Sequence, residues 1–147
     1  MKRIVAAVDL SEPSLRAADL AADLASRYDA ELVLLTVGRD IGAPDPGMQA
    51  YAQLEHIREP ISTLHVEALR ESLAGTCERA TAAGARHVTA EVAVGEPADE
   101  ILAFAKAEQA DLIVVGSRGH GRLAGLLLGS VAQKVVALAA CPVVVVH

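Results

Sequence analysis

Five short apolar runs are separated by alanine-rich stretches along this chain, and their alternation predicts the class of fold. Four of the runs are almost continuously apolar, which is typical of strands covered on both faces of a parallel sheet. The third run alternates instead, with His87, Thr89 and Glu91 on one side, and therefore predicts an edge strand. The five predicted strands are Ile4–Val8, Leu32–Val37, Val88–Val94, Leu112–Val115 and Val143–Val146.

Helices are predicted between the strands, and glycine and proline mark several of their boundaries. Gly84 stands where a helix ends in the left-handed conformation, Pro97 where a helix starts, and Pro142 where the last strand opens. Ser130 with Gln133 three residues later has the spacing of a capping box, which marks a helix start or restart. The predicted helices are about Pro13–Tyr28, Thr63–Ala83, Pro97–Glu108 and Leu123–Ala139. Strands and helices in turn predict right-handed βαβ units in a doubly wound, Rossmann-like α/β fold with helices on both faces.

The length of the chain predicts a single domain over residues 1–147. One segment interrupts the alternation: Gly38 to Ser62 is rich in glycine and proline and links the second strand to its crossover helix. Connections of this length are unusual in a compact domain and tend to be functional or mobile. We expect a partly ordered excursion near the C-terminal edge of the sheet.

Charge and aromatic content exclude some classes of partner. A net charge of −6 argues against a DNA- or RNA-binding protein, and 2% aromatic residues leave few platforms for stacking single strands. All 19 acidic residues lie at or before Asp111, whereas residues 112–147 carry only Arg118, Arg122 and Lys134 as charged side chains. A locally positive region of this kind attracts a small anion. The alternative is a chance cluster on one helix face.

Cysteines, histidines and the N-terminus indicate the compartment. Cys77 and Cys141 lie far apart, and neither they nor the five histidines have metal-ligand spacing, so we expect reduced, buried thiols and no protein-bound metal. Met1 to Arg3 lead directly into the first apolar run without a signal peptide, and no apolar stretch reaches the roughly 18 residues that span a bilayer. We therefore expect a cytoplasmic protein without a membrane partner.

The candidate chemistry lies at the carboxyl ends of the strands, where open α/β sheets bind their ligands. The residues at these ends are Asp9, Val37, Val94-Gly95 and Gly116-Ser117. Gly116 opens a loop of pattern G-x2-G-x9-G-S, in which Gly119 is followed after nine residues by Gly129 and Ser130. Glycines allow the backbone to approach an anion, amides at a helix start point toward it, and Ser130 adds a hydroxyl. The pattern is neither a Walker A loop nor a G-x-G-x-x-G fingerprint, and it predicts a site for nucleotide phosphates.

At this point the chain resembles the universal stress protein family, from its first strand to its last. The resemblance rests on Ile4-Val5-Ala6-Ala7-Val8-Asp9-Leu10-Ser11, Val94-Gly95-Glu96-Pro97, the loop from Gly116 to Ser130, and Cys141-Pro142-Val143-Val144-Val145-Val146. The loop has the form found in the ATP-binding branch of that family. The resemblance implies the strand order 3-2-1-4-5, ATP lying across the loop with Mg²⁺ or Mn²⁺ carried by its phosphates, and a homodimer formed largely through the last strand, Val143–Val146.

The resemblance also implies roles for individual residues. Asp9 would lie beside the adenine and ribose, Val37 would meet the adenine through its backbone, Gly116 and Gly119 would line the ribose and first phosphates, and Gly129, Ser130 and Val131 would bind the later phosphates. The sequence departs from the family at Leu10, where glycine often follows the aspartate of the first strand.

Most of these residues have a simpler structural interpretation as well. Asp9 could only cap the following helix, and Ser130 could be an N-cap, a phosphate ligand or both. Arg118 and Arg122 could close over phosphate or remain solvated surface charges. His120 is expected in an exposed loop rather than as a general base.

Three functions remain open from the sequence. The leading one is a dimeric regulatory module for stress response that binds adenine nucleotide and reports energy or stress state to partners. The second is an enzyme on the same fold, a slow ATPase or a nucleotidyl-transferring protein, although the loop lacks a lysine and no base is evidently placed for an attacking water. The third is a structural or interaction dimer that binds no nucleotide.

Overall fold

The five predicted strands form one parallel sheet in the computed structural model, which describes residues 1–39, 46, 61–119 and 128–147. The strands are β1 (Arg3–Ala7), β2 (Glu31–Gly38), β3 (His87–Val94), β4 (Leu112–Gly116) and β5 (Val143–Val146), and their order across the sheet is β3-β2-β1-β4-β5. This confirms the doubly wound α/β fold and the strand order that the resemblance implied. It also confirms that the alternating strand, β3, lies at an edge.

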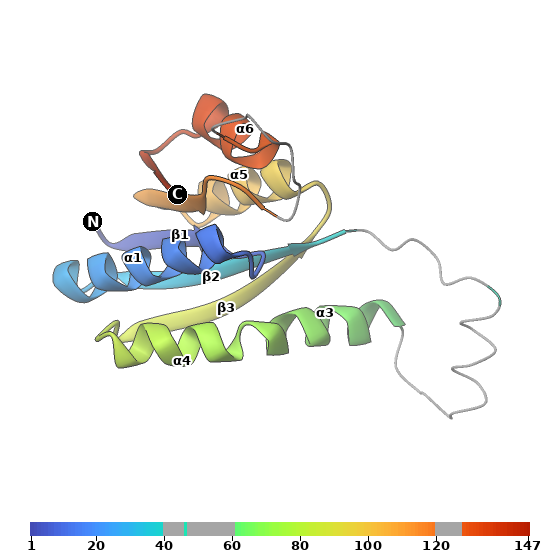
Figure 1. Ribbon diagram of the computed structural model, residues 1–147, viewed down its shortest axis with the longest axis horizontal. Helices are drawn as coiled ribbons and strands as arrows, with labels where there is room; N and C mark the ends of the chain where they lie inside the picture. The colour runs from blue at the N-terminus through green and yellow to red at the C-terminus, as the bar shows by residue number, and fades with distance from the viewer. Residues whose placement is uncertain (40–45, 47–60, 120–127) are drawn as a thin grey trace.

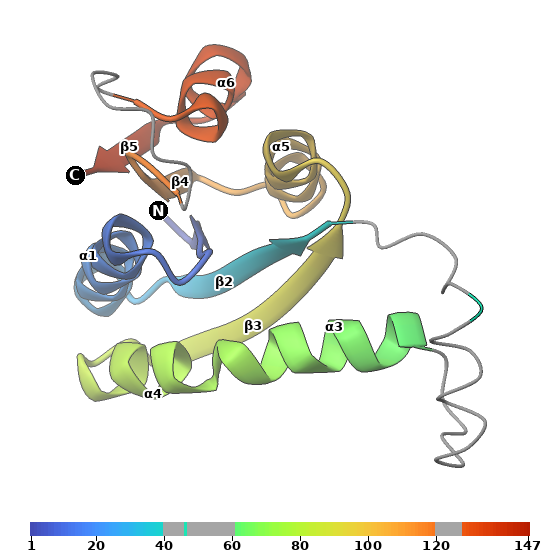
Figure 2. The same ribbon diagram turned by 45° about the vertical axis from the view of Figure 1, so that its right-hand side comes forward.

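Helices cover both faces of the sheet (Figures 1 and 2). They are α1 (Glu12–Tyr28), α3 (Ile61–Ser72), α4 (Ala74–Ala82), α5 (Pro97–Ala107) and α6 (Ser130–Leu138). The first three lie on one face and the last two on the other. Successive residues of a strand point to opposite faces, so Ile4 packs in the core beneath α1 and Val5 in the core beneath α5 and α6. Both side chains are fully buried.

Alanine accounts for the close packing of α1 against the sheet. The buried stripe of this helix consists of Ser14 and five alanines, Ala17, Ala18, Ala21, Ala22 and Ala25. Their spacing follows the three-to-four-residue period of an amphipathic helix. Small side chains let the helix axis approach β1 and β4, so a core with few aromatic residues is still filled.

Two predicted helices differ from the observed ones. The stretch Thr63–Ala83 is divided at Leu73, where the backbone N–H donates to the Arg70 carbonyl at 3.1 Å in a tight turn. Leu73 is itself fully buried, so the break places a large apolar side chain in the core. The last helix begins at Ser130 rather than at Leu123; residues 123–127 lie outside the described part of the chain, and Leu128 and Gly129 are not helical.

The predicted helix boundaries at glycine and proline are confirmed. Gly84 follows the end of α4 with φ +100°, and Pro97 is the first residue of α5. The segment from Gly38 to Ser62 lies outside the described residues except at its two ends and at Pro46, so its predicted conformation stays a prediction. In the described part of the chain, no helix has the length and apolar character needed to cross a membrane.

The cysteines are unpaired, as predicted, but each is half-buried rather than buried. Partial burial raises the pKa of the Cys77 thiol and of the Cys141 thiol above the ordinary value.

Candidate functional site

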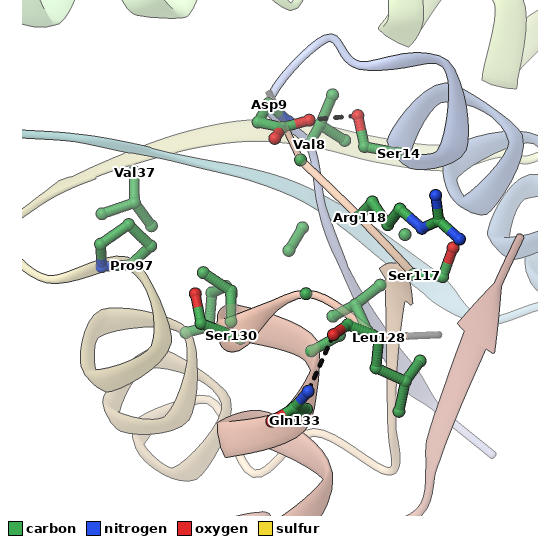
Figure 3. Close-up of a pocket in the computed structure, with 18 of the residues that line it drawn as sticks. Val8, Asp9, Ser14, Val37, Pro97, Ser117, Arg118, Leu128, Ser130 and Gln133 are labelled. Atoms are coloured by element: carbon green, nitrogen blue, oxygen red, sulfur yellow. Dashed lines mark hydrogen bonds between the residues drawn. The ribbon is translucent and has the colours of Figure 1, made fainter. Parts of the chain in front are cut away.

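A cavity of about 440 Å³ opens at the carboxyl ends of β1, β2 and β4, between the first turns of α5 and α6 (Figure 3). This is the point where the strand order reverses, because the chain leaves β1 toward β2 and later returns to the other side of β1 at β4. All eight predicted site residues line the cavity: Asp9, Val37, Gly116, Arg118, Gly119, Gly129, Ser130 and Val131. Val94-Gly95, the end of the remaining strand named in the sequence analysis, does not line the cavity, and the Gly95 N–H donates to the Gly38 carbonyl at 2.9 Å.

The N-terminus of α6 forms one end of the cavity. Gly129 precedes the helix in an extended conformation, and its N–H donates to the Ser117 carbonyl at 2.7 Å, which fixes the end of the loop. The first intrahelical bond runs from the Gln133 N–H to the Gly129 carbonyl at 3.0 Å. Helix geometry therefore leaves the N–H groups of Ser130, Val131 and Ala132 without an intrahelical acceptor, and all three residues line the cavity. Such a helix end favours an anion.

The predicted capping box is not formed. Gly129 is the N-cap residue, Ser130 is the first residue of the helix, and no side chain caps this helix end. The Gln133 amide instead donates through Nε2 to the Leu128 carbonyl at 2.8 Å (Figure 3). The Ser130 hydroxyl is thus not used as an N-cap.

Two glycines in the loop allow close contacts between segments. A Cβ atom at Gly116 would lie 2.7 Å from the Ser14 backbone nitrogen, so this glycine lets β4 pass against the first turn of α1. A Cβ atom at Gly119 would clash with the Oδ2 atom of Asp9. The glycine spacing thus positions the loop against β1 and α1 in addition to opening the cavity.

Asp9 organises the turn between β1 and α1. Its Oδ1 atom accepts hydrogen bonds from the Ser11 N–H at 3.0 Å and from the Ser11 hydroxyl, and its own N–H donates to the Ser14 Oγ at 3.3 Å. The N-cap of α1 is Ser11 rather than Asp9, and the Asp9 carboxylate holds this N-cap residue through the two hydrogen bonds from Ser11. Leu10, between the two, has a left-handed backbone with φ +64°.

The β2 side of the cavity has an apolar wall. Val37 from β2 lies beside Pro97 from α5 (Figure 3), and Leu35 and Ile101 of the same two elements also line the cavity. Arg39 follows the end of β2 and also lines the cavity. A ligand in the cavity would therefore meet apolar side chains of β2 and α5 as well as the helix amides of α6.

Several lining residues were not predicted from the sequence. Arg39 lines the cavity and stands just beyond a strand end, and this position in the sequence is the signal that could have identified it. Ser14 is 3% exposed, and nothing in the sequence distinguishes it from a surface serine. Ser117, also 3% exposed, was named at its strand end but was given no role in binding. Pro97 and Ile101 belong to a helix, and only the packing of α5 brings them to the cavity.

The basic residues of the C-terminal quarter have separate positions. Arg118 lines the cavity, but its guanidinium points away from Ser130 (Figure 3). Lys134 forms an ion pair with Asp99 of α5 at 2.7 Å, so it belongs to the contact between two helices. Arg122 and His120 lie outside the described residues. Among the residues described, no cluster of three or more histidine, cysteine, aspartate or glutamate side chains could hold a metal ion.

The fold and the cavity define an α/β protein with a ligand site at its topological switch point, and comparison with known proteins supplies the family. The family model described as the universal stress protein family matches residues 1–147. Universal stress protein YxiE of Bacillus subtilis (strain 168) is 38% identical over 148 residues, which cover 99% of this chain and 98% of that protein. The chain belongs to the universal stress protein family.

Solved structures support the same assignment. Universal stress protein UspA from Lactobacillus plantarum has a TM-score of 0.78 and 25% identity, with 99% of this chain and 97% of that chain covered. A universal stress protein solved in complex with cAMP has a TM-score of 0.70 and 32% identity, with coverage of 99% and 97%. The second structure shows that this fold accepts an adenine nucleotide in a relative.

Proposed function

We propose that this protein binds ATP in the cavity at the switch point and acts as a dimeric regulatory module in stress response that holds the nucleotide rather than turning it over rapidly. The observation that carries the proposal is the N-terminus of α6, where three successive N–H groups without intrahelical acceptors belong to residues of the cavity wall. The cAMP complex of a relative with 32% identity supports an adenine nucleotide as the ligand.

The phosphates are assigned to the α6 end of the cavity. Amide groups of Ser130 and Val131 would donate to phosphate oxygens, and the Ser130 hydroxyl would add a further donor. Arg118 supplies a positive charge on the same side of the sheet and would approach phosphate only after its side chain rotates. Mg²⁺ or Mn²⁺ would enter as the complex with ATP, coordinated by the phosphate oxygens.

The adenine is assigned to the β2 end of the cavity. Val37 lies beside Pro97 there, and an apolar wall suits the faces of a base. Asp9 follows β1, the strand between β2 and β4, and lines the cavity, so its carboxylate would accept a hydrogen bond from a ribose hydroxyl. The carboxylate is in contact with Gly119, so ligand and loop would be coupled at this point.

Equilibrium binding measured by calorimetry tests the proposal. We expect ATP to bind at or below millimolar concentration, and more weakly as salt is raised, because part of the affinity comes from phosphate charge. Parallel measurements of ATP turnover separate a nucleotide-holding protein from an enzyme. A rate well above about one per second would place the protein among ordinary enzymes and overturn this part of the proposal.

A pair of substitutions at Ser130 isolates the helix amide. Proline is favoured at the first position of a helix, and the preceding Gly129 already has the extended conformation that proline requires, so S130P should fold normally. S130P removes both the N–H and the hydroxyl, whereas S130A removes only the hydroxyl. A hydrogen bond to a charged group contributes about 1.5–3 kcal/mol, so S130P should weaken ATP binding at least tenfold relative to S130A.

Adenosine serves as the ligand control for this pair, because it has no phosphate. Its affinity should be the same in S130P and S130A. Equal ATP affinities in the two variants would show that the start of α6 does not bind phosphate, even if ATP binds elsewhere.

A further inference from the structure

The base end of the proposed nucleotide site lacks an aromatic partner among the residues described. The wall there is aliphatic, formed by Val37, Pro97 and Ile101. Phe104 of α5 packs against the core beneath α5 and α6 and does not line the cavity. A purine bound against this wall would use one face, and its other face would need a second planar group or would remain in water.

Arg39 is the lining residue that can supply a planar group at this end. It stands two positions after Val37, and residues two apart along an extended chain point to the same side. Gly38, between them, faces the other side: a Cβ atom there would lie 3.2 Å from the Nε2 atom of His65 and would also meet Leu69 of α3. The alternation therefore directs Val37 and Arg39 to the cavity while Gly38 packs against α3.

The position of Arg39 separates it from the phosphate end. β2 and β4 are not neighbours, because β1 lies between them, and two strand spacings amount to roughly 10 Å. The loop that leads to the α6 amides leaves β4, so Arg39 starts from the side of the cavity assigned to the base. Arg39 is exposed, so rotation of its side chain could bring the guanidinium over a bound ligand.

We propose that Arg39 binds the base of the nucleotide, with its guanidinium stacked on the face that Val37 and Pro97 leave uncovered. This inference rests on the proposed function, since it assigns a residue of the same site. The guanidinium is planar and weakly hydrated, so it stacks on an aromatic face in a way that a lysine ammonium does not. The contact would favour a large base and add to affinity without touching phosphate.

Three variants of the full chain test the proposal. R39A removes the guanidinium, R39K keeps the charge without the planar group, and R86A is the matched control. Arg86 is an exposed arginine paired with Asp29 at the opposite end of the sheet, so R86A makes the same change in net charge. Binding of ATP and of adenosine to each variant is measured by calorimetry at two salt concentrations.

Stacking of a cation on an aromatic face predicts a loss of roughly threefold to tenfold in R39A. The same loss should appear in R39K, for ATP and adenosine alike, and at both salt concentrations, while R86A should match the wild type. Recovery of ATP affinity in R39K, with a salt-dependent loss in R39A, would show a phosphate contact and overturn the proposal. Wild-type affinity in R39A would also overturn it.

Failure of this inference is distinguishable from failure of the proposed function. If the wild-type protein binds ATP and the Arg39 variants bind it with the same affinity, the nucleotide site is supported and the role of Arg39 is overturned. Absence of ATP binding to the wild type would overturn both.

Discussion

Leu10 shows how the first turn of the site accommodates an unusual residue. Its φ of +64° lies in the left-handed region, which costs an ordinary side chain roughly 1–2 kcal/mol. The hydrogen bonds from Ser11 to the Asp9 carboxylate close the turn around it. Leu10 is 43% exposed, so its side chain recovers only part of the burial energy that could offset the strain. The sequence departs from its family at this position, and the structure keeps the turn at a cost in stability.

Replacing Leu10 with glycine should therefore stabilise the protein. L10G relieves the left-handed strain, and the greater freedom of glycine in the unfolded chain offsets part of the gain, so we expect the free energy of unfolding to rise by about 0.5–1 kcal/mol. Urea denaturation followed by circular dichroism measures it. Leu20 provides the control, because it is 37% exposed in the middle of α1, where L20G should lower the free energy of unfolding by about 1 kcal/mol. A destabilised L10G would show that the leucine side chain contributes more than the turn costs.

Sequence patterns located the site well because its residues are set by backbone requirements. Gly116 and Gly119 stand at close approaches between segments, and glycine is the residue that such approaches require. A Cβ atom at Gly129 would make only ordinary contacts, at 3.4 Å or longer. Arg39 and Ser14 were not predicted, because an arginine beyond a strand end or a serine in the first turn of a helix has many environments and only packing selects one. The roles of the eight predicted residues in binding nucleotide stay predictions.

At the scale of elements, the sheet was more predictable than the helix ends. Strands in a parallel sheet are buried on both faces, so they appear as apolar runs that a sequence shows directly. Helix ends depend on which backbone groups find partners. The break at Leu73 and the start of α6 at Ser130 arise from local hydrogen bonds that hydrophobic periodicity does not register. The capping-box spacing predicted a helix start at Ser130, and α6 does begin there, although the side-chain hydrogen bonds of a capping box are not formed.

Asp111 joins the first and fourth strands at the end of the sheet opposite the cavity. Its Oδ2 atom accepts hydrogen bonds from the backbone N–H groups of Lys2 and Arg3, the second at 3.0 Å. The Asp111 N–H donates in return to the Arg3 carbonyl at 2.9 Å. The Arg3 side chain adds ion pairs to Glu31 and Glu108. The start of β1 is thus fixed to β2 and β4 by charge-assisted hydrogen bonds.

The Asp111 contacts predict a dependence of stability on pH. The hydrogen bonds from the Lys2 and Arg3 N–H groups lower the pKa of the Asp111 carboxyl below its ordinary value of 3.8. A carboxyl whose pKa is lower in the folded state stabilises the fold above the unfolded pKa, and this contribution is lost as the pH falls through the folded pKa. D111N should be less stable than the wild type at neutral pH, and the difference should shrink below about pH 4. Urea denaturation at several pH values measures it, and a difference that is constant with pH would contradict the assignment.

At the scale of the whole molecule, the two edges of the sheet differ in composition. β3 carries polar side chains and exposes His87, Thr89 and Val94, whereas β5 consists of four half-buried valines. Two further apolar side chains of α6 are exposed nearby in the chain: Val136 at 48% and Leu138 at 62%. A bare apolar edge of this kind readily pairs with another strand. The sequence predicted a homodimer through Val143–Val146, and the exposure of these residues in the single chain is consistent with that prediction without testing it.

The register of β5 identifies a substitution that tests the dimer. Ile113 donates to the Pro142 carbonyl and Ser117 to the Val146 carbonyl, so even-numbered residues of β5 bond to β4 while the N–H groups of Val143 and Val145 point outward. V145P removes an outward N–H and leaves the bonds to β4 intact, which an edge strand tolerates. V144P is the contrasting variant, because it removes a bond to β4 and leaves a carbonyl of β4 without its donor, which should destabilise the fold by about 1–3 kcal/mol.

Sedimentation equilibrium at micromolar concentration should therefore find a wild-type dimer and a folded V145P monomer. Antiparallel pairing of two β5 strands across a two-fold axis would use the outward N–H of Val145 twice, once from each copy, so a single substitution removes two bonds from the interface. At a concentration where both proteins are monomeric, the free energy of unfolding of V145P should equal that of the wild type. This comparison separates loss of strand pairing from loss of folding. A wild-type monomer would contradict the homodimer. A dimeric V145P would place the interface on another surface, with the exposed apolar side chains of α6 as the next to be substituted.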